Sequence, residues 1–86
     1  MTEHELLMML VDEQIALLKE RNLTPDEALV IGATVNDEYT IERFGEIEAV
    51  KIANEAIRKS KNSDEVFRNV KIALDIQPQN VIVETD

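Results

Sequence analysis

One segment decides the fold of this chain: residues 23–40, with the sequence LTPDEALVIGATVNDEYT. Its first residues carry the signals of a helix start. Thr24 can cap a helix, Pro25 suits the first helical position and Glu27 can complete a capping box. The sequence therefore predicts a helix that begins at Pro25.

The rest of the same segment also fits a β-hairpin over residues 28–44. Residues 29–35 are rich in β-branched side chains, and Asn36-Asp37 fits the two-residue loop of a hairpin. We favour the helix because the capping signal is local and specific, whereas Asn-Asp is a weaker hairpin loop than Asn-Gly. A helix here would be apolar on every side, so we expect it in the centre of the fold, with Gly32 allowing a neighbouring backbone to approach closely.

The preceding segment predicts a long helix from Thr2 or Glu3 to Arg21, with Asn22 as its stop. At about 100° per residue, its apolar side chains cover an arc of about 200° that only Gln14 interrupts. A helix that rests on one layer needs an apolar stripe of little more than about 100°. This helix is therefore expected to contact two surfaces, the second being its own bundle or another molecule. The arc consists of Leu6, Leu7, Met8, Leu10, Val11, Ile15, Leu17 and Leu18.

Two further helices are predicted after the deciding segment. The first, from about residue 46, has small and apolar residues on one face and polar residues, Asn54 among them, on the other. It follows either a kink near Gly45 or a turn capped by Thr40. The second begins at Ser63 and stops at Gln77-Pro78.

These elements predict a mainly α fold, a small bundle of about four helices with a short C-terminal extended segment. An α+β fold with a hairpin at residues 28–44 is the alternative. Residues 1–78 would form a single helical domain, and residues 79–86 a tail or an added strand.

Composition and charge restrict the class of function. The 86 residues include no cysteine, so no disulfide or thiolate metal site can form, which is consistent with a reducing cytosol. The net charge is −9, and residues 1–50 hold 12 acidic and 3 basic residues, a field that opposes nucleic acid phosphates. The longest apolar run, LLMMLV at residues 6–11, is far too short to span a membrane. We expect a cytoplasmic protein that binds neither nucleic acids nor membranes.

No group of side chains predicts catalysis, so we expect no catalytic residue, no metal and no cofactor. His4 is the only imidazole, which excludes a triad or a multi-histidine metal site, and Ser60 and Ser63 lack a nearby base. A row of carboxylates would line one helix face if residues 38–47 were helical. Magnesium sites of all-α nucleotide pyrophosphohydrolases draw tighter acidic clusters from two facing helices, so such a hydrolase is only a remote alternative. The row consists of Glu38, Glu42 and Glu46.

The pattern favours a small, acidic, non-enzymatic interaction protein, an adaptor or inhibitor. We expect it to form a homodimer, to bind another protein, or both, through the broad face of the first helix. The expected interface residues are Leu7, Met8, Val11, Ile15 and Leu18. An alternative is an inhibitor that imitates nucleic acid and occupies a DNA- or RNA-binding protein through an acidic surface. That surface would consist of Asp26, Glu27, Asp37, Glu38, Glu42 and Glu46.

Overall fold

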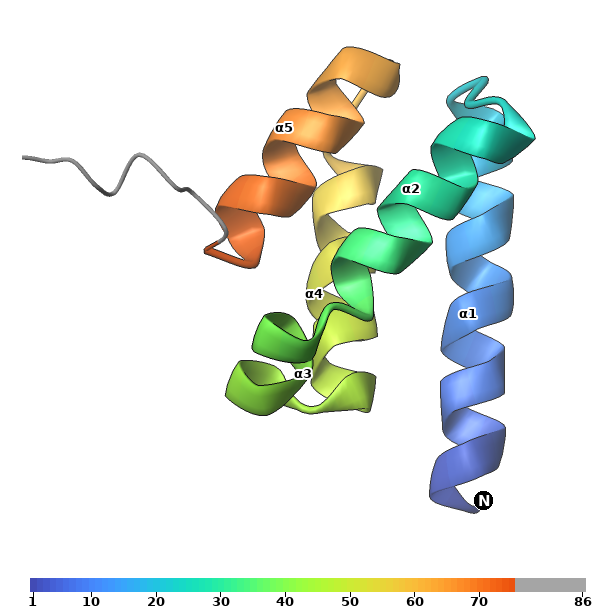
Figure 1. Ribbon diagram of the computed structural model, residues 1–86. Coiled ribbons are helices and arrows are strands. Elements are labelled where there is room, and N and C mark those ends of the chain that lie inside the picture. Colours follow the sequence, from blue (N-terminus) through green and yellow to red (C-terminus); the bar gives the residue numbers. More distant parts are fainter. Residues whose placement is uncertain (76–86) are drawn as a thin grey trace, which may run out of the picture.

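The computed structural model describes residues 1–75, which form five helices and no strand (Figure 1). The prediction of a mainly α bundle is confirmed, and the hairpin alternative for residues 28–44 is wrong. The predicted C-terminal tail or strand, residues 79–86, lies outside the described residues. The helices are α1 (Glu3–Glu20), α2 (Pro25–Val35), α3 (Glu38–Phe44), α4 (Glu46–Arg58) and α5 (Ser63–Ala73).

Capping boxes start the first two helices. The Thr24 hydroxyl accepts a hydrogen bond from the Glu27 amide at 3.2 Å, and the Glu27 carboxylate accepts one from the Thr24 amide at 2.8 Å. Thr2 and Glu5 form the same arrangement at the start of α1. Each pair satisfies backbone donors that a helix leaves free at its first turn, which is why residues 25–35 are helical despite their β-branched side chains.

A short fifth helix, α3, was not predicted as a separate element. The Asp37 carboxylate caps it by accepting from the Tyr39 amide at 3.0 Å. Gly45 ends it at φ +82°, a backbone conformation that favours glycine, so the predicted break at this residue is confirmed. The suggested cap at Thr40 is wrong, because that residue is buried and its hydroxyl lies 3.4 Å from the Thr34 carbonyl oxygen.

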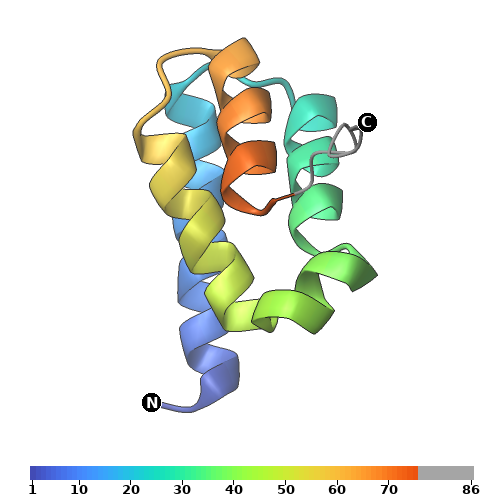
Figure 2. The same ribbon diagram turned by 90° about the vertical axis from the view of Figure 1, so that its left-hand side faces the viewer.

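Helix α4 is the central element because it packs on each of the other four helices, and Figure 2 shows it in front of α1. Ala49, Ala53 and Ile57 are fully buried on α4, and Val66 and Val70 on α5 pack into the same core. Small residues on α4 let α1 and α5 approach closely. Helix α5 begins at Ser63, as predicted, with Asn62 as its cap, but it ends at Ala73, earlier than the predicted stop at Gln77-Pro78.

Helix α2 contradicts the expectation of a central position. It packs on α3, α4 and α5 but has no extensive contact with α1. Ile31 and Val35 are its buried residues, whereas Leu29 and Val30 are exposed. The physical reason is that α1 and α5 take both sides of α4, which leaves α2 only one layer to rest on.

Candidate functional site

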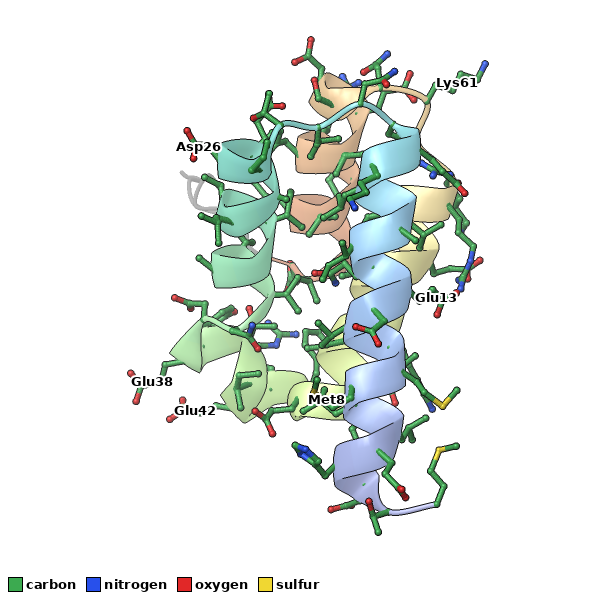
Figure 3. The ribbon with its side chains drawn as sticks, turned by 90° about the vertical axis from the view of Figure 1, so that its right-hand side faces the viewer. Met8, Glu13, Asp26, Glu38, Glu42 and Lys61 are labelled. Carbon is green, nitrogen blue, oxygen red and sulfur yellow. The ribbon has the colours of Figure 1, made fainter. Side chains whose placement is uncertain are left out.

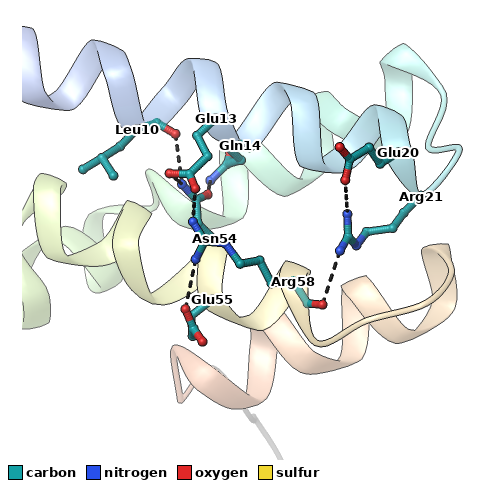
Figure 4. Close-up of polar contacts among 8 residues, drawn as sticks. All are labelled: Leu10, Glu13, Gln14, Glu20, Arg21, Asn54, Glu55 and Arg58. Carbon is teal, nitrogen blue, oxygen red and sulfur yellow. Dashed lines mark hydrogen bonds and ion pairs between the residues drawn. The ribbon is translucent and has the colours of Figure 1, made fainter.

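Helix α1 has one closed side, and α4 covers it (Figure 4). Leu10 and Leu17 of α1 pack against the core there. The Gln14 amide nitrogen donates to the Asn54 side-chain oxygen at 3.1 Å, and the Asn54 amide nitrogen donates to the Leu10 carbonyl at 3.0 Å. Asn54 is only 1% exposed, so its assignment to the polar face of α4 was wrong. This polar pair aligns the two helices, because a shift would leave buried amides without partners.

Charged side chains also join α1 to α4 at the edge of this contact. Arg58 of α4 forms an ion pair with Glu13 of α1. Arg21, at the end of α1, donates to the carbonyl oxygens of Ser60 at 3.0 Å and Arg58 at 3.3 Å. These carbonyls lie where α4 ends and has no intrahelical donors left for them. The closed side of α1 is therefore held to α4 by apolar packing, buried hydrogen bonds and an ion pair.

The opposite edge of α1 faces α2 across an apolar groove of about 850 Å³ (Figure 3). Val11 and Ile15 of α1 form one wall, Ala28 and Leu29 of α2 form the other, and buried Val50 of α4 contributes to the lining between them. The full lining is Val11, Gln14, Ile15, Leu18, Lys19, Leu23, Thr24, Pro25, Ala28, Leu29, Gly32, Ala33, Val35, Asn36 and Val50. Lys19 is the one charged residue among them, so the groove offers an apolar surface and little polar chemistry.

The structure brings three of the five predicted interface residues to this groove. Val11 and Ile15 lie on its wall, and Ile15 is 47% exposed, while Leu18 lies deeper and is only 2% exposed. Met8 is exposed on α1 outside the groove. Leu7 instead lines a separate hollow of about 490 Å³ near the junction of α3 and α4.

Sequence reasoning missed the contribution of α2. Leu29 is 72% exposed on the groove wall, where it adds to the apolar surface contributed by α1. The available signal was that residues 28–35 are apolar on every side, which we interpreted as a central position. The same pattern also fits a surface helix with one face left for another molecule.

Gly32 is an open position on the same wall. Within residues 1–75, no heavy atom lies within 4 Å of the place where a Cβ would stand, apart from the adjacent backbone of α2. The predicted close approach of a neighbouring backbone is therefore not made by the described part of this chain. A glycine inside a helix costs about 0.5–1 kcal/mol relative to alanine, and no contact made by residues 1–75 requires it.

The predicted acidic surface is divided. Asp26 lies at one end of α2, and Glu38 and Glu42 lie beyond the other end (Figure 3). Glu27 and Asp37 accept backbone hydrogen bonds as helix caps, and Glu46 follows the break at Gly45, so the expected row of Glu38, Glu42 and Glu46 is not continuous. Among residues 1–75, no group of three acidic, histidine or cysteine side chains is placed to hold a metal ion.

The structure also places His4, Ser60 and Ser63, the remaining residues considered for catalysis or metal binding. His4 is exposed near the start of α1 and lines the hollow beside Leu7. The buried Ser60 hydroxyl donates to the Ala56 carbonyl at 2.8 Å and accepts from the Asn69 amide at 2.9 Å. Ser63 is the first residue of α5. Neither hydroxyl has a general base as a hydrogen-bond partner in the described structure.

Comparison of the chain with protein-family models, with curated proteins and with solved structures finds no match. Among the described helices, none combines the length and the apolar character needed to span a membrane. The groove between α1 and α2 is therefore the feature of the molecule on which a functional conclusion rests.

Proposed function

We propose that this protein is a non-catalytic interaction module that binds an apolar helix face in the groove between α1 and α2. One observation carries the proposal: within residues 1–75, the apolar arc of α1 is covered by α4 on one side only, and its other edge faces a groove that no described residue fills. Val11 and Ile15 stand on that edge, opposite Leu29 of α2. Fully burying an exposed aliphatic side chain is worth about 1.5–3 kcal/mol, so an occupant that covers this surface gains affinity from each of them.

The dimensions suit a short helix. The α1 wall runs from Val11 to Lys19 and the α2 wall from Pro25 to Asn36, which correspond to about 12 and 16 Å at 1.5 Å per residue. Two to three helical turns fill that length. A helix bound in this way inserts apolar side chains at positions i, i+3, i+4 and i+7, as is usual for helices in grooves.

A second copy of the chain is another candidate occupant. Leu29 projects beside the groove on the same face of the molecule. Two copies related by a two-fold axis could each insert Leu29 into the groove of the other, which is the self-complementary geometry of a symmetric dimer. Light scattering at high micromolar concentration measures this directly: a dimer supports self-association, and a strictly monomeric protein excludes it.

The function itself is tested with a neutral probe, a helical peptide with leucine on one face and glutamine on the other. We expect it to shift the NMR methyl signals of Val11, Ile15 and Leu29. Ile15→Gln should abolish the shifts, whereas Ile72→Gln on α5 should not, because Ile72 is similarly exposed at 56% but lies outside the groove. Peptide binding that leaves these methyl signals unchanged would contradict the proposal.

A further inference from the structure

We infer that the occupant of the groove is a basic amphipathic helix of another protein, an inference that rests on the function proposed above. The two helices that frame the groove, α1 and α2, are strongly acidic. Together α1 and α2 carry seven acidic residues and a single lysine, Lys19. The apolar groove therefore lies within a negative field, which favours a helix with an apolar stripe and flanking positive charges.

Several of these acids are free to meet a partner. Glu13 and Glu20 are paired with arginines of this chain, and Glu5 and Glu27 are occupied as caps. Asp12 and Asp26 are exposed, and neither forms an ion pair within residues 1–75.

The carboxylates of Asp12 and Asp26 stand beside groove residues. Asp12 follows Val11 and lies about 100° from it around α1, on the solvent side of the wall. Asp26 precedes Leu29 by three residues, so the two share a face of α2. A helix seated between the walls would have an acidic group on each flank.

The same charges disfavour a second copy as occupant. Each chain carries −9, and residues 1–50, which include both groove helices, account for all of that excess. A symmetric dimer would bring two of these acidic faces within the Debye length of about 8 Å at physiological ionic strength, where like charges repel. A partner of opposite charge gains from the same field.

Gly32 supplies a second observation that points to an occupant helix. The space above it is empty in the described structure, so a partner backbone can approach the α2 wall there. A side chain at this position would start from open space on the groove wall, because its Cβ meets no atom of the other described elements within 4 Å. Gly32→Leu should therefore block the occupant while leaving the fold intact.

The experiment uses three 14-residue helical peptides with the same leucine stripe and with lysine, glutamine or glutamate at all other positions. A fourth peptide keeps the lysines and replaces leucine by serine. We expect the lysine peptide to bind about tenfold more tightly than the glutamine peptide, because a few exposed charge pairs each contribute modestly to binding, and the glutamate peptide to bind more weakly still. The serine peptide should leave the groove methyl signals unchanged.

Variants of the chain test which carboxylates cause the preference for the lysine peptide over the glutamine peptide. Asp12→Asn with Asp26→Asn should remove most of the difference between the lysine and glutamine peptides. The matched control, Glu48→Gln with Asp64→Asn, removes the same charge away from the groove and should preserve it. Added salt should weaken the lysine peptide and leave the glutamine peptide nearly unchanged.

The outcomes separate this inference from the proposed function. If all three leucine peptides shift the groove methyl signals with equal affinity, the charge inference is overturned and the groove function stands. If the protein is a dimer whose groove accepts no peptide, the occupant is a second copy and the inference is overturned. If a monomer binds no leucine peptide in the groove, both are wrong. Loss of lysine-peptide binding in Gly32→Leu, with helix content unchanged, supports the inference.

Discussion

The two sides of α1 are built from one helical pattern but differ in how they are covered. Toward α4, the apolar side chains of α1 pack against the core and Gln14 donates to Asn54. Arg21 donates to the carbonyl oxygen of Ser60, just beyond the end of α4. Toward α2, Val11 and Ile15 line an open groove. The difference indicates that the two sides have different roles. Contacts on the closed side stabilise the fold, and the open side is available for binding. Substitutions on the two sides should therefore have separable effects on stability and on binding.

We expect the largest loss of stability for a substitution in the hydrophobic core, against which the closed side of α1 packs. Ile57 of α4 is fully buried, so Ile57→Ala leaves a cavity and should lower the free energy of unfolding by about 2–5 kcal/mol. Urea denaturation followed by circular dichroism measures this. A loss below about 1 kcal/mol with an unchanged denaturant slope would show that α4 is not at the centre of the stable core.

The polar pair on the closed side should give the next largest effect. Asn54→Ala removes the partner of the buried Gln14 amide, and an unsatisfied buried polar group costs about 1–3 kcal/mol. Replacing both residues by leucine should cost less than Asn54→Ala alone, because no polar group is then left without a partner. The single variants Gln14→Leu and Asn54→Leu complete a double-mutant cycle with the double leucine variant, and strictly additive effects there would show that the two side chains are not coupled.

The closed side could largely be predicted from the sequence. The capping signal at Thr24 and the amphipathic pattern of α4 are local, so they predict helices regardless of what packs against them. The 200° arc of α1 predicted two contact surfaces; among the described helices α4 supplies one, and the second stays a prediction. The Gln14–Asn54 pair could not be predicted, because each residue alone looks like a polar interruption and only the packing of α1 on α4 brings them together.

The open side could be predicted only in part. Val11 and Ile15 were singled out from α1, but Leu29 was not, and Gly32 was expected to admit a backbone of its own fold, because apolar residues on every side of a helix fit a central position as well as an exposed one. The choice depends on tertiary packing: α1 and α5 occupy the two sides of α4 and leave α2 at the surface. The short helix α3 was missed for a related reason, since Asp37 was interpreted as a possible hairpin residue rather than a cap.

On the open side, Gly32→Ala should raise the stability of the free protein. A Cβ at this position meets no atom within 4 Å in the described structure, and alanine in a helix is favoured over glycine by about 0.5–1 kcal/mol. The melting temperature should rise by a few degrees, which differential scanning calorimetry measures. A fall in melting temperature would mean that the groove is filled in the free protein.

The smallest effect on stability, and the sharpest contrast with the closed side, is expected for Ile15→Gln. Ile15 is 47% exposed, and glutamine is a better helix former than isoleucine, so the free energy of unfolding should change by no more than about 0.5 kcal/mol. Ile72→Gln, an equivalent change on α5, should behave in the same way. Denaturation curves of both variants, recorded beside the wild type, provide the comparison. Core substitutions typically lower the free energy of unfolding by about 2 kcal/mol or more. A loss of that size for Ile15→Gln but not for Ile72→Gln would show that the groove edge of α1 is part of the folded core. In that case α1 would not have two distinct sides.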